Sequence, residues 1–229
     1  AAMALAVLVS LAAPGRDRPS LAPPRATLRD GHWHGTNYPG AMHEPAWTDT
    51  NLVDRFADEA YASVKGYVRT RVLHHHLLEH LPPAPAPVLD VGGGAGHQSF
   101  PLALAGYDVT LLDSSPAMLD KARQRLDRLP DEARKRVRLV EADGENADDA
   151  VDGQRFAAVL CHGVLGYQED PEPLLGQLCR CVADGGVVSI MSGNAATTAV
   201  RPALQRRWDE ALAAFDTTTE TVPGLGVRG

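Results

Sequence analysis

A glycine-rich turn preceded by an acid is the feature of this sequence best suited to hold a ligand. The apolar run 88–91 leads into it, and the whole stretch reads Val88-Leu89-Asp90-Val91-Gly92-Gly93-Gly94-Ala95-Gly96. Glycine has no Cβ, so backbone amides in such a turn can approach a ligand closely where the next helix begins. A second apolar run, about 20 residues further on, ends at Asp113. A carboxylate at the tip of the second strand of a βαβ unit can accept hydrogen bonds from a ribose diol, so the two features predict a nucleoside-containing cofactor.

The glycine spacing distinguishes between two classes of nucleoside cofactor. A dinucleotide-binding turn has the pattern G-x-G-x-x-G beside a pyrophosphate, and counting from Gly92 its third glycine would fall on His97. The chain instead has Gly92, Gly94 and Gly96 at alternate positions after Asp90. An acid in the turn suits a cationic ligand and would repel a pyrophosphate. A nicotinamide-dependent oxidoreductase is therefore disfavoured, and a tight turn in an unrelated α/β protein is the structural alternative.

Strands alternate with helices along the chain, which predicts an α/β fold with a Rossmann-like, doubly wound, mainly parallel sheet. The expected strands are 88–91, 107–112, 137–140, 156–161 and 187–191. The expected helices are 51–81 with a division at Gly66, 98–104, 116–130, one from Pro171 to a stop at Asp184-Gly185-Gly186, and 196–215.

Composition predicts one such domain preceded by a leader. At 229 residues the chain can bury a sizeable core, and a net charge of −7 argues against holding nucleic acid by the overall field. Residues 14–41 are rich in Pro, Gly and Arg, so we expect 1–41 to be a disordered leader or linker and 42–229 to be the binding domain. The apolar start is too short to span a membrane. The three cysteines lack metal-ligand spacing, so we expect buried free thiols in the cytoplasm and no metal.

Further candidate side chains stand at the ends of the third and fourth strands. Asp143, Gly144 and Glu145 follow the third strand, where an acid or a backbone amide commonly faces an adenine ring, although Asp143 could instead cap a turn. His162 ends the fourth strand, where it could contact the cofactor or act as a general base; the alternative is a histidine satisfied by local backbone.

Two charged or polar clusters are expected to be surface features. Consecutive histidines point in different directions on a helix, so His74, His75, His76 and His80 favour a solvated face over a metal site. The basic residues of 121–138 alternate with acids, which is more typical of a surface helix than of an RNA contact.

The acid-x-Gly-x-Gly-x-Gly turn resembles that of class I S-adenosylmethionine (SAM) methyltransferases. Over about residues 56–215 the chain is similar to the bacterial tRNA 5-carboxymethoxyuridine methyltransferase family, in Lys65-Gly66-x-x-Arg69, Leu160-x-His162 and Gly185-Gly186-Val187-x-Ser189-x-Met191-x-x-Asn194. The resemblance implies SAM contacts from Arg69, Gly92, Gly93, Asp113, Gly144, Glu145 and His162. The family has a small residue and a glutamine where this chain has Asp143-Gly144-Glu145. It also has seven strands, so we expect the last two to be missing and the domain to be incomplete at its C-terminus.

The expected function is methyl transfer from SAM to an oxygen or nitrogen acceptor. A carboxylate of a modified tRNA wobble uridine, as in the resembled family, would need no general base because it is already ionised at neutral pH. A hydroxyl or amine acceptor would make His162 the base. Acceptor contacts would come from Tyr167, Asn194, Arg201, Arg206 and Arg207. A small-molecule methyltransferase and a truncated, non-catalytic SAM-binding domain are the alternatives; no membrane partner is expected, and the sequence does not indicate an oligomeric state.

Overall fold

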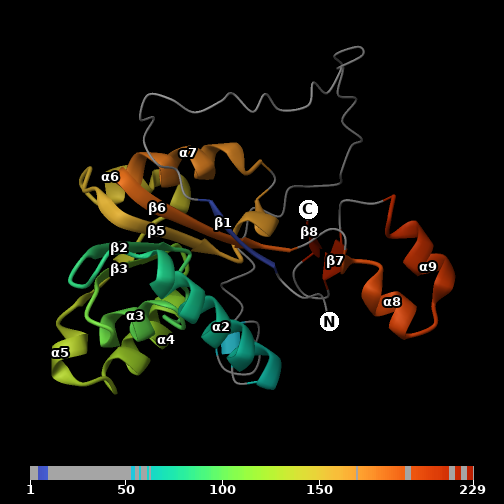
Figure 1. The fold of residues 1–229 in the computed structure, drawn as a ribbon, viewed down its shortest axis with the longest axis horizontal. Coiled ribbons are helices and arrows are strands. Elements are labelled where there is room, and N and C mark those ends of the chain that lie inside the picture. The colour runs from blue at the N-terminus through green and yellow to red at the C-terminus, as the bar shows by residue number, and fades with distance from the viewer. Residues whose placement is uncertain are drawn as a thin grey trace, which may run out of the picture.

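Six strands form the main sheet of the computed structural model, in the order β1-β6-β5-β2-β3-β4 (Figure 1). The structure describes residues 5–9, 53–54, 57, 61, 63–168, 170–193, 197–216, 220–222 and 226–228, with the backbone alone for 5–9, 220–222 and 226–228. Neighbouring strands are parallel from β6 to β4: β2 (Pro87–Val91), β3 (Asp108–Asp113), β4 (Val137–Glu141), β5 (Phe156–His162) and β6 (Val182–Ser192). The expected doubly wound parallel sheet is confirmed.

The sixth strand comes from the expected leader. β1 (Leu5–Val9) pairs antiparallel with β6, so that Leu5 lies opposite Ser192 and Val9 opposite Val188. No strand was expected here, because a short apolar run shows no periodicity and its partner strand is about 180 residues away along the chain. The rest of the leader, including Met42, lies outside the described residues, and the boundary at 42 stays a prediction.

Helices cover both faces of the sheet (Figure 1). On one face lie α2 (Val64–His80), α3 (Ser99–Leu104), α4 (Pro116–Leu126) and α5 (Asp131–Arg134); on the other lie α6 (Ala147–Ala150) and α7 (Glu172–Cys181). Strand side chains alternate accordingly: Val88 packs with α2 and α3, whereas Leu89 and Val91 pack with α7. Burying each such side chain contributes roughly 1.5–3 kcal/mol, so the two layers hold the strand ends in fixed positions.

The start of α4 is the one the sequence predicts. Ser115 Oγ accepts a hydrogen bond from Met118 N at 3.2 Å, and Pro116 occupies the first helical position. A hydroxyl cap followed by proline satisfies or removes backbone donors that would otherwise be unpaired. The helix therefore begins directly behind Asp113, at the tip of β3.

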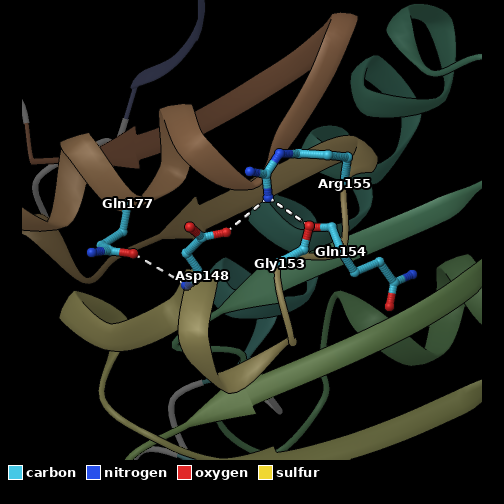
Figure 2. A network of polar contacts seen from close by, with 5 residues as sticks. All are labelled: Asp148, Gly153, Gln154, Arg155 and Gln177. Carbon is cyan, nitrogen blue, oxygen red and sulfur yellow. Dashed lines mark hydrogen bonds and ion pairs between the residues drawn. The ribbon is translucent and has the colours of Figure 1, made fainter.

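A polar network ties together the face that carries α6 and α7 (Figure 2). Arg155 Nη1 donates to Asp148 Oδ1 at 2.8 Å and to the Gly153 carbonyl at 2.7 Å. The backbone amide of Asp148 donates to Gln177 Oε1 at 3.1 Å, which connects α6 to α7. These bonds fix the turn that leads into β5, whose last residue is His162.

Several helix boundaries differ from those expected, and α4 ends at Leu126 instead of continuing to residue 130. Ser63 Oγ accepts from Gly66 N at 3.0 Å and caps α2, so Gly66 lies in the first turn of the helix and does not divide it. α7 ends at Cys181, and Asp184–Gly186 belong to β6. The expected helix 196–215 is two helices, α8 (Val200–Leu204) and α9 (Trp208–Ala213), separated by Arg206 with a φ of +59°. A residue with a left-handed backbone conformation ends a helix. The apolar residues keep a helical spacing on both sides of Arg206, so the sequence pattern does not reveal the break.

The apolar stripe of α2 faces inward only in part. Leu73 and Leu77 are buried, whereas Val64, Val68 and Val72 are 83%, 51% and 50% exposed. The face of α2 that packs on the sheet is therefore narrow, because the outer surface of a single helix layer faces solvent.

Several remaining features concern the periphery. Beyond α9, β7 (Glu220–Val222) and β8 (Gly226–Arg228) pair antiparallel in a separate sheet and do not extend the main one.

Cys161 and Cys181 are buried free thiols as expected, but Cys179 is exposed. No helix in the described part of the chain is long and apolar enough to cross a bilayer.

Candidate functional site

The glycine turn adopts a backbone that other residues would strain. Gly92, Gly94 and Gly96 have φ values of +69°, +54° and +78°. A Cβ on Gly96 would lie 2.4 Å from the ring of Phe100, so both conformation and space require glycine there. The amides of Gly92 and Gly93 donate to the Leu112 carbonyl at 2.8 and 3.2 Å, which places the turn against the end of β3.

Asp113 joins this turn to the second strand tip, as the sequence predicts. Its Oδ2 accepts from Gly94 N at 2.8 Å and its Oδ1 accepts from Ser115 N at 2.9 Å. Burial raises the pKa of Asp113, and the hydrogen bonds from Ser115 and Gly94 counteract that rise. A carboxylate offers about four lone-pair positions, so acceptor capacity remains for a diol.

Asp90 places a second carboxyl group under the turn. It is 2% exposed, and Ser99 Oγ donates to its Oδ2 at 2.6 Å. Burial raises the pKa of Asp90 to about 6; the Ser99 hydrogen bond lowers it and the charge of Asp113 raises it. At neutral pH the site therefore contains a buried negative charge that has few compensating partners. The sequence located Asp90 but not Ser99.

A hollow that is open to solvent at its mouth lies against the turn. It brings together five of the predicted contacts, namely Arg69, Asp90, Gly92, Gly93 and His162. Its other lining residues, Tyr61, Thr70, Leu73, His97, Gln98 and Met191, were not among the predicted contacts. Gly94, Gly96 and Asp113 build the turn beside the hollow without lining it.

Tyr61, His97 and Arg69 form a stacked group at the hollow. The rings of Tyr61 and His97 are 3.8 Å apart and inclined by 13°, and the Arg69 guanidinium lies 4.9 Å from the centre of the Tyr61 ring. Arg125 hydrogen-bonds His97 Nε2. His97 thus packs behind the turn, at the position where a dinucleotide-binding turn would need glycine. Burial raises the pKa of Tyr61, and the charge of Arg69 lowers it. No sequence motif includes Tyr61.

His162 is held by the neighbouring strand. Its Nε2 lies 2.9 Å from Ser189 Oγ on β6. Its Nδ1 is buried and has no hydrogen-bond partner in the described part of the protein. Burial lowers the pKa of His162 to about 4, so the ring is neutral at neutral pH. A buried polar atom without a partner, in a residue that lines a hollow, is a candidate for a hydrogen bond to a ligand.

The tip of β4 is built as a capped turn. Asp143 Oδ1 accepts from Glu145 N at 2.9 Å and caps the short 3₁₀ helix η3 (Gly144–Asn146). A Cβ on Gly144 would lie 2.8 Å from Leu174 Cδ1, so close packing explains that glycine. These three residues do not line the hollow, and their contact with a cofactor stays a prediction.

Residues expected to contact the acceptor lie elsewhere. Tyr167 is in the 3₁₀ helix η4 (Leu165–Tyr167), and Arg201, Arg206 and Arg207 are exposed on and between α8 and α9. None of the four lines the hollow, and Asn194 lies outside the described residues.

The histidines of α2 differ in their hydrogen-bond and ion-pair partners. His75 and His76 lie within 3.5 and 3.3 Å of Glu79, as expected of a surface face. His74 instead turns inward and hydrogen-bonds Gln98, so the expectation of a solvated residue is wrong for it. Within the described residues, no group of three or more metal-binding side chains is placed to hold an ion.

The basic residues of 121–138 largely form surface ion pairs. Arg123 pairs with Asp120, Arg134 with Asp131, Lys135 with Glu132 and Arg136 with Asp108, at 2.5 to 2.8 Å. Exposed pairs of this kind contribute about 0–1 kcal/mol each. They match the surface helix that the interleaved acids predict.

Comparisons with known proteins agree with this geometry. Residues 89–188 match a family described as a methyltransferase domain. The tRNA 5-carboxymethoxyuridine methyltransferase of Escherichia coli K12 is 29% identical over 150 residues, which cover 63% of this chain and 56% of that protein. The chloroplastic 2-methyl-6-phytyl-1,4-hydroquinone methyltransferase 1 of Oryza sativa subsp. japonica is 31% identical over 121 residues, covering 52% of this chain and 32% of that one. The chain therefore spans about half or less of these relatives.

A solved structure shares the fold. An O-methyltransferase family protein from Burkholderia thailandensis superposes with a TM-score of 0.52 at 22% identity, over 63% of this chain and 42% of that one. The parallel strand order, the acid-x-Gly-x-Gly-x-Gly turn and the match over residues 89–188 lead to one conclusion. Residues 89–188 match a methyltransferase domain, and the described part of the chain has the class I methyltransferase fold.

Proposed function

We propose that this protein binds SAM at the glycine turn and transfers its methyl group to an oxygen or nitrogen acceptor. The observation that carries the proposal is the pairing of Gly94 N with Asp113 Oδ2 at 2.8 Å, which fixes a nucleoside-recognising carboxylate beside a glycine turn. The match of residues 89–188 to a methyltransferase domain supports the same chemistry.

The residues around the hollow fit the charges of SAM. The cofactor's amino-acid end carries a carboxylate and an ammonium group, and the lining residues supply one guanidinium, Arg69, and one carboxylate, Asp90. Arg69 would bind the carboxylate by a charge-assisted pair. Asp90 would stabilise the cationic end through its buried negative charge. Asp113, next to the turn, would hold the ribose hydroxyls with its remaining acceptor capacity.

When bound, SAM supplies an electrophilic methyl group on a sulfonium. The tasks left to the protein are positioning and exclusion of water. Gly92 and Gly93 would let the backbone approach the cofactor, and Tyr61, stacked on His97, would cover it from the side of α2. A ring already stacked and largely buried loses little conformational entropy when a ligand arrives.

His162 is better suited to hydrogen bonding than to taking a proton. With its pKa lowered to about 4 by burial, it is a weak base at neutral pH. Its unpartnered Nδ1 could orient a group of the cofactor or of the acceptor. A carboxylate acceptor would need no base at all, whereas a hydroxyl or amine would have to lose its proton to His162 or to water.

For the acceptor, we propose a carboxylate of a modified wobble uridine in tRNA, on the similarity to the Escherichia coli enzyme. A small-molecule acceptor is the second candidate, because the net charge of −7 opposes association with RNA and the basic residues of 121–138 are largely neutralised by acids.

Incubation with SAM labelled in the methyl group tests both candidates. The protein is supplied with bulk tRNA or with a metabolite extract, and label transfer is measured with wild type and with Asp113→Asn. Label in tRNA that alkaline ester hydrolysis removes supports the first candidate, and label in a small molecule supports the second. SAM binding without transfer to either pool would favour a non-catalytic binding domain, and failure to bind SAM would refute the proposal.

A further inference from the structure

Two buried side-chain atoms in the described part of the protein have no hydrogen-bond partner, and both belong to residues that line the hollow. One is His162 Nδ1, which the proposed function already uses. The other is Gln98 Oε1. Buried polar atoms are rarely left unsatisfied, because they lose their hydrogen bonds to water. Gln98 is therefore a candidate ligand contact that neither the glycine motif nor the methyltransferase match points to.

Gln98 is held in place by His74. It is 7% exposed and stands directly before α3. Its Nε2 lies 3.2 Å from His74 Nδ1. Burial, helped by the charge of Arg71, lowers the pKa of His74, so the ring is neutral and Nδ1 can accept this hydrogen bond. With its nitrogen bonded to His74, the carboxamide keeps its oxygen as the free atom.

Charge in the hollow indicates which ligand group this oxygen would meet. Arg69 is the permanent cation among the lining residues and would take a carboxylate. Gln98 Oε1 and Asp90 are acceptors and suit a donor, and a donor with a positive charge makes the strongest hydrogen bond with them. An amino-acid zwitterion offers both groups a few ångströms apart.

We propose that the Gln98 carboxamide, oriented by His74, accepts a hydrogen bond from the α-ammonium group at the methionyl end of the cofactor. This assignment rests on the proposed function, because it requires SAM or its product in the hollow. Gln98 would then determine whether the site distinguishes the complete cofactor from one that lacks the amino group.

Binding of two ligands to two variants tests the assignment. The ligands are S-adenosylhomocysteine (SAH), the demethylated product of SAM, and desamino-SAH, in which hydrogen replaces the amino group. Calorimetry on the full chain should give Gln98→Leu about tenfold weaker binding of SAH, with desamino-SAH changed by less than about twofold. Gln98→Glu keeps an acceptor and should bind SAH at least as tightly as wild type. Gln124→Leu, at an exposed glutamine of α4, controls for the substitution itself and should change neither affinity.

The outcomes separate this inference from the proposed function. If SAH binds but Gln98→Leu weakens both ligands equally, Gln98 only shapes the hollow and the inference is wrong. The inference is also wrong if Gln98→Leu no longer distinguishes SAH from an analogue that lacks the carboxylate, because the amide nitrogen of Gln98 would then face the ligand. If Gln98→Leu does not fold, His74→Leu carries the test and should lose part of the discrimination. If wild type binds neither ligand, the proposed function fails and the inference fails with it.

Discussion

Replacing Asp90 by Asn should change how the stability of the protein depends on pH. Burial raises the pKa of this carboxyl from 3.8 to about 6 in the folded protein. The folded state therefore binds the Asp90 proton more tightly than the unfolded chain does. The folding free energy that comes from this tighter proton binding is present in full below about pH 3.8 and is lost as the pH rises through about 6.

The magnitude follows from the difference between the two pKa values. About two units at 1.36 kcal/mol each correspond to a loss of about 3 kcal/mol of folding free energy. About 2 kcal/mol of this falls between about pH 4.5 and pH 7.5. Asn can still accept the hydrogen bond from Ser99 but carries no titratable charge. The buried amide protons of Asn destabilise the folded state by an amount that does not depend on pH. The informative quantity is therefore how the difference in free energy of unfolding between variant and wild type changes with pH.

Urea denaturation at a series of pH values measures this difference. The free energy of unfolding of Asp90→Asn minus that of wild type should rise by about 2 kcal/mol between about pH 4.5 and pH 7.5. Asp149→Asn, at an exposed acid of α6, controls for removing one negative charge from a chain of net charge −7. If the free energy of unfolding of Asp90→Asn minus that of wild type stays constant or falls as the pH rises, then burial does not disfavour the charged form of Asp90.

Further substitutions separate the parts of the site. Asp90→Asn should weaken binding of both SAM and SAH in calorimetry, because both carry the ammonium group that the Asp90 charge would stabilise; unchanged affinity for both would contradict this. Arg69→Ala should weaken SAH about tenfold to hundredfold, with partial recovery in Arg69→Lys, and unchanged affinity would remove Arg69 from the site. Gly96→Ala should lose roughly 2 kcal/mol of stability or more, because its Cβ would meet Phe100 at 2.4 Å; Gly153→Ala, with a φ of +68° and nothing within 4 Å, should lose less. Because burial lowers the pKa of His162 to about 4, the methyl-transfer rate should show no ionisation of this residue near pH 6.5. If the rate does change with pH near 6.5, and His162→Asn abolishes that change, then His162 acts as a base.

The parts of the fold that could be predicted depend on local signals. The glycine turn, Asp113 and the Ser115-Pro116 helix start each occupy a few consecutive residues whose backbone preferences agree with the final structure. The five parallel strands followed from apolar runs of the right length between helical patterns. Such features can be predicted from the sequence, because the residues that determine them lie within one element.

The features that escaped prediction depend on contacts between distant residues. β1 is defined by its pairing with β6, and the break at Arg206 is concealed by apolar spacing on both sides. At the site, Tyr61 is fixed by stacking on His97, and Gln98 is fixed by a hydrogen bond to His74, 24 residues earlier. Neither residue belongs to a motif, so only the folded chain shows that they lie at the same hollow as Asp90.

Affinity for SAH in wild type and in Asp113→Asn tests most directly whether a nucleoside is held at the tip of β3. Asn keeps one acceptor oxygen for the amides of Gly94 and Ser115 but loses the charge and the capacity for both ribose hydroxyls. Calorimetry should show binding to wild type and affinity lowered by about tenfold to hundredfold in the folded variant. Equal affinity in the two proteins would contradict the assignment of Asp113 to the sugar, and a wild type that does not bind SAH would contradict the cofactor site as a whole.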